Sequence, residues 1–371
     1  MSALLSPDLP DRSPLSPRDP GRGRRRGDGT RARGGGGVSG PSLDLSIVIP
    51  SYETEALLAR CLEAVAGAAL ACPEVLAEVL VVDNGSRDGS ADYARRAGAR
   101  VVAFARNRGF AAAINAGLRL ARGRHVLLLN SDVELTAEAL SAGLTLLDAE
   151  PRVGVVGPAL SHPDGRPQRS VHVLPGLDSE LLGEDLVRHL RGVERDHEGP
   201  PVAWREVEAV RGAAFFVRGA ILEKVGTLDE GFFFFLEETD FCARVRAAGH
   251  RVAFLPGVPV GHALGASSKG RAPVATRIEY QRALDRALRR HRGTRVAALV
   301  RGIRFARAAG GVLLALGLAP VSARDRRRLR ERLGLMLWHL RGRPLEPSLA
   351  QALLEAPSGD GLLDRPGPGG V

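Results

Sequence analysis

Short apolar stretches alternate with helix-like patterns from residue 45 to residue 158. The apolar stretches are rich in β-branched residues and end in turn residues, which is typical of buried strands. They cover residues 45–50, 78–86, 99–105, 124–135 and 153–158. Apolar positions at helical spacing fill the gaps and predict helices over 54–70, 86–98, 109–123 and 136–150. This alternation predicts an α/β fold with a mainly parallel sheet and helices on both faces.

The pattern is less regular beyond the fifth strand. Residues 160–205 carry turn signals such as HPDGRPQ, and we expect a variable loop region there. A strand-like segment follows at 207–222, then a helix at about 238–248 and a strand at 251–257. From residue 276 onward the chain has the pattern of Arg-rich amphipathic helices.

Composition changes mark the ends of the chain. Residues 1–42 are rich in Pro, Gly and Arg and are predicted to be disordered, because such a segment cannot bury enough apolar surface to fold. Residues 276–343 are predicted to form a helical extension and 344–371 a flexible tail. The first residues lack the apolar run of a signal peptide, and the apolar run at 308–323 is too short and too broken by Gly and Pro for a membrane span.

The net charge of +10 is unevenly distributed. Residues 1–40 sum to +4, residues 269–343 to +16, and the middle of the chain, 41–268, to −7. The basic ends are therefore candidates for anionic partners, whereas the middle region is mildly acidic. Three cysteines without CxxC spacing indicate small core residues in a reducing compartment rather than metal ligands, so we expect a cytoplasmic protein.

Polar residues follow two of the predicted strands. Asp83 ends one of them, and Asn130, Ser131 and Asp132 end another. Ligands of parallel α/β sheets bind beyond these strand ends, where one carboxylate can hold Mg²⁺ or Mn²⁺ or accept a hydrogen bond from a nucleoside. Turn formation and helix capping explain the same residues equally well. The chain has neither GxGxxG nor GxxxxGK[ST], which counts against a dinucleotide-binding or P-loop fold.

The segment GFFFFLEETDFC, residues 231–242, places four phenylalanines beside three acids. Successive helical residues step by about 100°, so Glu237 and Asp240 lie near one face while Glu238 points away from Asp240. Arg244 follows Asp240 by one turn and predicts an ion pair. Burial among rings raises the pKa of a carboxylate toward the range of a general base, whereas the helix N-terminus lowers it.

His262 follows a strand and a glycine, where it is either a metal or phosphate ligand or a structural residue. The motifs gain specificity from their order: IVIPSYETE, VVDNGSRDGS, NRGFAAAINAGL, LLLNSDV, FFFFLEETDFCAR and the distal histidine. Together, across about residues 45–268, they resemble the family 2 glycosyltransferases, and most of all the rhamnosyltransferase-like branch that builds cell-surface polysaccharide.

The resemblance implies a GT-A fold over residues 43–275, with a nucleotide-binding half (43–158) and an acceptor-binding half (159–275). It implies an inverting transfer of a sugar, rhamnose being one candidate, from a UDP-, GDP- or dTDP-sugar to a lipid-linked or glycan acceptor, assisted by Mg²⁺ or Mn²⁺. By the same resemblance, residues that line or support the donor are Pro50, Tyr52, Glu53, Asp83, Asn107, Asn115, Asn130 and Ser131.

The resemblance implies that Asp132 and His262 bind the metal and that Glu238 is the general base. The chain departs from the family pattern in two places. NSD replaces DxD, which leaves one carboxylate for the metal, and Glu238 stands where Asp is commoner, which keeps Asp240 and Glu237 as alternative bases.

Two other functions compete with this interpretation. A sugar-phosphate nucleotidyltransferase shares the strand–helix alternation, but it would carry a Gly-rich basic loop where this chain has SYETEALLARC. A non-enzymatic binder of nucleic acid or another anionic surface would use the basic helices, yet the interleaved aromatics of base-stacking surfaces are missing, and no nucleic acid is expected. Arg301, Arg304 and Arg307 recur on one side of a helix, which suits either a peripheral contact with an anionic membrane or a packed appendage with a solvated arginine face.

Overall fold

The computed structural model describes residues 43–191, 204–263, 272–317 and 323–341, together with residues 349 and 352. The predictions for 1–42 and for 344–371 therefore concern residues outside the described part, apart from two positions in the tail. Residues from 43 onward form one unit.

The first half of the chain has the predicted alternation of strands and helices. Its strands are β1 (Leu45–Ser51), β2 (Ala77–Asp83), β3 (Arg100–Ala103), β4 (His125–Leu129), β5 (Val133–Glu134) and β6 (Val153–Ser161). Its helices are α1 (Glu55–Ala71), α2 (Ser90–Arg96), α3 (Phe110–Leu118) and α4 (Ala137–Ala149). The strand predicted at 124–135 is split in two, because Asn130, Ser131 and Asp132 form a turn between β4 and β5.

The second half contains more regular structure than the sequence predicts. Its strands are β7 (Pro167–Gln168), β8 (Val171–His172), β9 (Arg205–Val207), β10 (Ala209–Val210), β11 (Ala214–Arg218) and β12 (Arg251–His262). Its helices are α5 (Leu177–Leu182), α6 (Glu184–Leu190), α7 (Gly219–Val225), α8 (Glu237–Ala247), α9 (Pro273–Arg292), α10 (Thr294–Gly317) and α11 (Ala323–Leu340). The described part of the loop expected at 160–205, up to residue 191, thus contains two strands and two helices, because their apolar runs are too short to be recognised in sequence.

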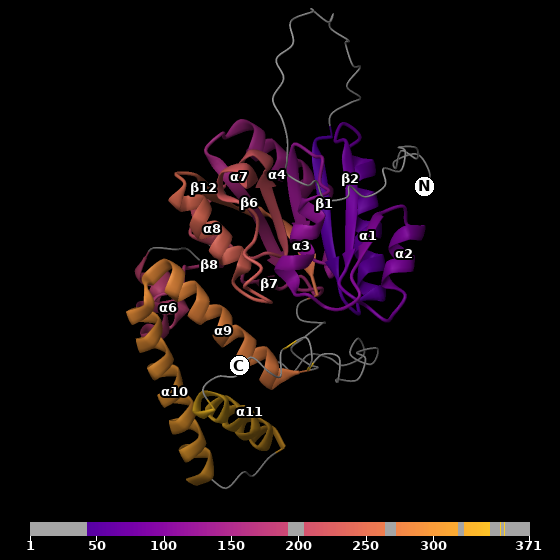
Figure 1. Ribbon diagram of the computed structural model, residues 1–371. Helices are drawn as coiled ribbons and strands as arrows, with labels where there is room; N and C mark the ends of the chain where they lie inside the picture. The colour runs from indigo at the N-terminus through magenta and orange to yellow at the C-terminus, as the bar shows by residue number, and fades with distance from the viewer. Residues whose placement is uncertain are drawn as a thin grey trace, which may run out of the picture. The chain divides into compact units, whose positions relative to one another are not determined.

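The main sheet has the strand order β3-β2-β1-β4-β11-β6-β12-β5, with β7 paired to β6 and β9 to β12. Figure 1 shows part of this order, with β2, β1, β6 and β12 following one another across the sheet. Strands β1 to β4 are parallel, and β6 is parallel to β12. Strand β11 runs antiparallel to both β4 and β6. The mainly parallel sheet followed by C-terminal helices confirms the predicted α/β class.

Alternate side chains of the strands enter two cores. Ile47 and Ile49 of β1 pack with α1 and α4 on one face, whereas Val48 packs with α3 and α8 on the other. The β11 neighbours Phe216 and Phe215 divide in the same way. This two-sided burial explains why the strands are nearly continuous apolar runs. The three cysteines are free and buried, as expected for core residues.

Candidate active site

A cavity of about 980 Å³ lies at the carboxyl ends of β1 and β4. The sheet contributes Pro50, Tyr52, Asn130, Ser131 and Asp132 to its lining. The opposite wall comes from the residues before and at the start of α8 and from the C-terminal helices. Those residues include Phe233, Phe234, Phe235, Glu237, Glu238, Thr276, Arg277, Tyr280, Leu284 and Leu335.

Three buried hydroxyl groups connect the two sheet loops under the cavity. The Oγ atoms of Ser51 and Ser131 each lie 3.0 Å from Oγ1 of Thr54. These two hydroxyl contacts fix the loop after β1, which carries Tyr52, against the turn after β4, which carries Asp132. Ser131 therefore serves the site through its hydroxyl contact with Thr54 as well as by lining the cavity.

Two neighbouring asparagines shape the loop that precedes α3. Nδ2 of Asn84 donates to Oδ1 of Asn107 and to the carbonyl of Gly109, both at 3.1 Å. The Gly109 amide in turn donates to Oδ1 of Asn107 at 2.9 Å. Both asparagines line the cavity. Asn84 was not among the predicted site residues, although its place directly after a buried strand was a usable signal.

Three predicted donor residues do not line the cavity. Asn115 is buried and bonded through its amide to both the N–H and the carbonyl of Leu228, so its support for a ligand is indirect. Oε1 of Glu53 accepts a hydrogen bond from the Arg87 amide at 2.8 Å. Asp83 is buried, with Oδ2 bonded to the Ser86 amide at 3.2 Å, whereas its Oδ1 has no hydrogen-bond partner among the described residues. That oxygen is itself buried, and it does not face the cavity.

Asp132 and His262 are brought together by the pairing of β5 with β12, in which His262 lies opposite Val133. Nε2 of His262 lies 3.4 Å from Oδ1 of Asp132. Its Nδ1 lies 2.9 Å from Oε1 of Gln168. Oδ1 of the neighbouring Asn130 is buried and has no hydrogen-bond partner in the described part of the chain.

These atoms fit a divalent metal only as part of its shell. Within the described residues no group of three or more His, Cys, Asp or Glu side chains could hold a metal by itself. Mg²⁺ is usually bound by one or two carboxylates together with substrate phosphates, and imidazole also suits transition metals. Asp132 and His262, with the unpaired oxygen of Asn130 nearby, are compatible with that mode of binding.

The acids of the FFFFLEETD segment have three different environments. The side chain of Asp240 has no exposed surface and accepts from Nε of Arg244 at 2.9 Å, the predicted i,i+4 pair. Nε2 of His291 in α9 lies 2.8 Å from its other oxygen, and Arg290 lies 3.4 Å away. Asp240 therefore fastens α8 to α9 and does not line the cavity.

Glu237 is the desolvated acid. It is buried, lines the cavity, and its Oε2 has no hydrogen-bond partner among the described residues. Burial, and next the nearby charge of Glu238, hold the pKa of Glu237 well above its usual range. The aromatic environment thus acts on this carboxylate.

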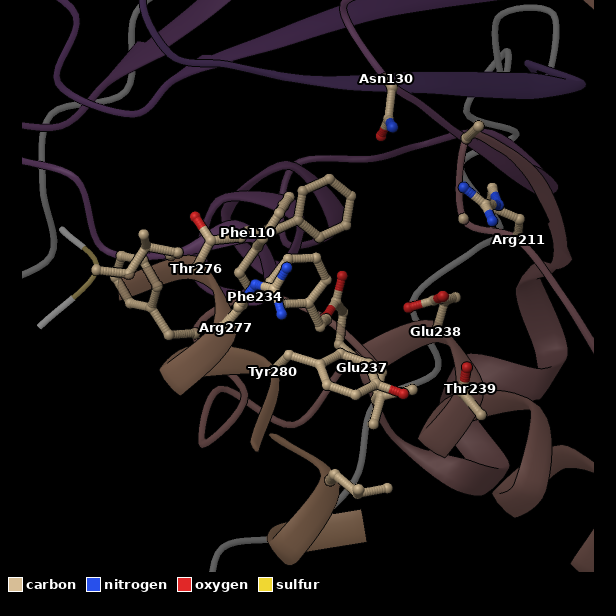
Figure 2. Close-up of a pocket in the computed structure, with 18 of the residues that line it drawn as sticks. Phe110, Asn130, Arg211, Phe234, Glu237, Glu238, Thr239, Thr276, Arg277 and Tyr280 are labelled. Atoms are coloured by element: carbon tan, nitrogen blue, oxygen red, sulfur yellow. The ribbon is translucent and has the colours of Figure 1, made fainter. Parts of the chain in front are cut away.

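Glu238 is half-buried, lines the cavity, and forms no ion pair or hydrogen bond with any described residue. Figure 2 shows Glu237 and Glu238 side by side, with both carboxylates directed toward the space that Asn130 faces from the sheet. A side chain at Gly212 would press on Glu238, since a Cβ there would lie 3.2 Å from both Cβ and Cγ of the glutamate. Gly212 therefore makes room for Glu238.

The four phenylalanines divide between core and cavity. Phe232 is fully buried against Ala283 and Ala287 of α9, whereas Phe233, Phe234 and Phe235 line the cavity. Phe235 and Leu236 have φ angles of 75° and 63°, a left-handed conformation that is strained for residues with side chains. This strained turn directly precedes the two acids that face the cavity.

The predicted arginine stripe of α10 faces other parts of the protein. Arg301 pairs with Asp285 of α9 at 2.7 Å, and Arg304 pairs with Glu180 of α5 at 2.7 Å. Arg307 lies 3.4 Å from the same glutamate. Each arginine of the stripe is therefore engaged in an ion pair within the protein, although the side chain of Arg307 remains 55% exposed. No described helix is long and apolar enough to cross a bilayer.

A cavity beyond the strand ends of an α/β sheet is the usual ligand site of such folds. Residues 46–210 match the family model described as Glycosyl transferase family 2. This match, over less than half of the chain, confirms the predicted resemblance to the family, and the mainly parallel sheet described above agrees with the GT-A-type fold that the resemblance implies. The match supports a glycosyltransferase.

Two of the curated relatives of the chain are named as glycosyltransferases. The chain is 29% identical over 214 residues to an N-acetylglucosaminyl-diphospho-decaprenol L-rhamnosyltransferase of Mycobacterium tuberculosis, covering 53% of this chain and 69% of the relative. It is 25% identical to the low-salt glycan biosynthesis hexosyltransferase Agl10 of Haloferax volcanii, covering 55% and 62%. It is also 29% identical to protein y4gI of Sinorhizobium fredii, covering 66% of this chain but only 27% of that protein.

Solved structures also resemble the chain. The mannosyltransferase PcManGT from Pyrobaculum calidifontis, in complex with GDP-Man and Mn²⁺, has a TM-score of 0.48 at 19% identity, covering 80% of this chain and 86% of that one. Staphylococcus aureus TarS 1–349 in complex with UDP-GlcNAc has a TM-score of 0.46 at 18% identity, covering 84% and 87%.

Proposed function

We propose that the protein is an inverting glycosyltransferase that moves a sugar from a nucleoside-diphosphate donor to an acceptor hydroxyl, with Glu238 as the general base. The observation that carries this proposal is the position of Glu238. Glu238 has no hydrogen-bond or ion-pair partner among the described residues, and it faces the same cavity as His262 and as Asp132, which lies within the residues 46–210 that match the family 2 model.

The donor half of the proposal uses the sheet side of the cavity. Pro50 and Tyr52 would line the nucleoside. A hydrogen bond from the nucleoside to Asp83 is proposed on the family resemblance alone, because the unbonded Oδ1 of Asp83 is buried outside the lining of the cavity. Asp132 and His262, beside the unpaired Oδ1 of Asn130, would hold Mg²⁺ or Mn²⁺ next to the diphosphate. When bound, the metal would neutralise the negative charge that develops on the leaving diphosphate.

The chemical step then needs one proton acceptor. Glu238 takes the proton of the acceptor hydroxyl while that oxygen bonds to the anomeric carbon of the donor sugar. The bond from the same carbon to the diphosphate oxygen breaks, and the nucleoside diphosphate leaves with the bonding electrons. Attack opposite the leaving group inverts the anomeric centre. Phe233, Phe234 and Phe235 line this side and exclude water from the reacting groups.

The acceptor is proposed from the relatives and from the lining of the cavity. The mycobacterial relative is named for an acceptor linked to diphospho-decaprenol, and Agl10 for glycan biosynthesis. The wall that would face the acceptor is rich in aromatic and aliphatic side chains, among them Phe234, Tyr280 and Leu335. A lipid-linked or glycan acceptor, met at the cytoplasmic face of the membrane, suits this wall, and rhamnose is one candidate for the sugar.

The proposal is tested by replacing Glu238 with Gln, which keeps the size of the side chain and removes its basicity. A general base usually contributes about 10²- to 10⁴-fold to the rate, so we expect a loss of that order with unchanged donor binding. Donor binding is measured by thermal shift with nucleotide sugars and Mg²⁺ or Mn²⁺. Near-normal turnover by Glu238→Gln, or no thermal shift of the wild type with any donor, would contradict the proposal.

A further inference from the structure

The histidine beside Asp132 is held from behind by an amide whose orientation is fixed. Gln168 is buried, and its Nε2 lies 2.5 Å from the carbonyl oxygen of His262 and 3.2 Å from that of Ser161. Carbonyl oxygens only accept hydrogen bonds, so the amide nitrogen must face them. Oε1 of Gln168 is then the atom that faces His262, at 2.9 Å from Nδ1.

This orientation decides which nitrogen of His262 carries the proton. An amide oxygen cannot donate, so Nδ1 of His262 must donate to Gln168. In the neutral ring, Nε2 then presents its lone pair to Oδ1 of Asp132, 3.4 Å away. Two electron-rich atoms facing each other at this distance repel unless a second proton on Nε2 or a metal cation lies between them.

We propose that Gln168 is a positioning residue that holds His262 in the Nδ1–H tautomer, so that Nε2 is presented with Asp132 to the divalent metal of the donor site. This inference rests on the metal step of the proposed function. Gln168 acts only through His262: it does not line the cavity. A metal-ligating histidine commonly donates its other N–H to such a partner, and loss of that partner typically lowers metal affinity about 10- to 100-fold.

The backbone provides the reason for a long-range contact of this kind. Gln168 pairs with Leu160 at the end of β6, while β6 pairs with β12 up to Ser161 and Gly261. The side chain of Gln168 reaches the last residue of β12 from β7. The position lies in the region where the sequence predicts only a variable loop.

The first experiment reads the tautomer without any metal. In protein carrying ¹⁵N-labelled histidine, at one mildly alkaline pH, the His262 signals are assigned by their loss in His262→Gln. We expect Nδ1 to be protonated in the wild type. In Gln168→Leu the proton should move to Nε2, because Asp132 is then the acceptor that remains. An Nε2–H tautomer in the wild type, or no difference between the two proteins, overturns the inference.

The second experiment measures Mn²⁺ affinity by electron paramagnetic resonance of free Mn²⁺, with UDP, GDP or dTDP present. Gln168→Leu should bind Mn²⁺ about 10- to 100-fold more weakly. Gln168→Glu should stay near the wild type, since it keeps the acceptor for Nδ1 but loses the donor to the two carbonyls. A merely structural role predicts that both variants lose affinity equally, and that result overturns the inference, as does no loss in either.

A double-mutant comparison keeps the test valid if Gln168→Leu is less stable than the wild type. In a His262→Ala background, Gln168→Leu should cause no further loss of Mn²⁺ affinity, because the residue it positions is gone. An equal loss in both backgrounds overturns the inference. If the wild type binds no Mn²⁺ with any of the nucleotides, the metal step of the proposed function fails as well. Wild-type binding with unchanged variants refutes only the role of Gln168.

Discussion

Three acids within four residues differ in function because their surroundings differ. Asp240 is enclosed by Arg244, His291 and Arg290. Glu237 is buried near the charges of Glu238 and Glu279, and Glu238 is left facing the cavity without a partner in the described structure. The chemistry of a carboxylate is set by what lies within a few ångströms, so neighbouring identical side chains are not interchangeable.

Glu237 should make the stability of the protein depend on pH. Its folded pKa is raised mainly by burial, so the folded state keeps a proton that the unfolded state loses. The free energy of unfolding therefore falls as the pH rises from the unfolded pKa through the folded one. Glu237→Gln removes this loss. We therefore expect the free energy of unfolding of the variant to exceed that of the wild type by a growing amount as the pH rises from about 5 to about 8.

Urea unfolding at several pH values measures this difference, and the exposed Glu223→Gln is the control because it should follow the wild type at every pH. Parallel pH profiles for the wild type and Glu237→Gln would mean that Glu237 is ionised in the folded protein.

Gly212 should control the rate through Glu238. A Cβ at this position would lie within 3.2 Å of Glu238, tighter than ordinary contact, so Gly212→Ala should displace the base. We expect kcat to fall, with little change in the KM for the donor, by less than the roughly 100-fold that a displacement of about 1 Å can cost, since Glu238 has to move by only a few tenths of an ångström. Gly67→Ala is the matched control, because nothing lies within 4 Å of its added methyl group. Equal kcat values for both variants would contradict a positioning effect of Gly212.

At the scale of elements, the contact between α8 and α9 depends on one carboxylate. Removing one partner of a buried ion pair typically costs about 3–5 kcal/mol, so Asp240→Ala should strongly reduce the free energy of unfolding. Asp92→Ala is the control: it breaks the exposed pair with Arg95 and should change stability by less than about 1 kcal/mol. Urea unfolding of both variants gives the comparison. Similar, small losses would show that α8 and α9 are held by apolar packing instead.

The elements that sequence predicts well are those with long periodic patterns. Strands β1 to β4 and β6 and helices α1 to α4 are predicted from buried apolar runs and helical spacing. The ion pair of Asp240 with Arg244 is predicted from helical spacing as well. The contacts of Gln168 with His262 and of Asp240 with His291 join residues 94 and 51 positions apart. Local pattern carries no information about such pairs, because they depend on sheet order and helix packing. The pKa of Glu237 could not be predicted from the sequence either. Burial raises it and the helix N-terminus lowers it, and the sequence does not tell which effect is larger.

At the scale of the whole molecule, much of the basic charge is used internally. Arg301 and Arg304 bridge α10 to α9 and α5, and α5 lines the cavity through Ser179 and Glu180. These arginines therefore hold the cavity wall in place, and a contact with anionic lipid would need other residues.

The double variant Arg301→Gln, Arg304→Gln should lower the melting temperature and leave flotation on phosphatidylglycerol vesicles unchanged. Its physical reason is that two partly buried acids each lose an arginine partner, although Asp285 keeps Arg289 and Glu180 keeps Arg307, while the exposed surface changes little. The exposed Arg295→Gln is the control variant. It should alter neither the melting temperature nor the flotation on the vesicles. A double variant that keeps its melting temperature but no longer floats would restore α10 as a lipid-binding face.

The ion pairs of Asp240 in α8 with Arg290 and His291 in α9 also affect how the C-terminal helices can be exchanged between related enzymes. The C-terminal helices supply Thr276, Arg277 and Tyr280 to the cavity, so exchanging them between relatives is an attractive way to change the acceptor. The helices that replace them must, however, bring groups equivalent to Arg290 and His291. Without these groups, Asp240 would keep only Arg244 of its own helix as a partner, two residues from the proposed base Glu238, and the part of the enzyme that was never exchanged would lose stability as well.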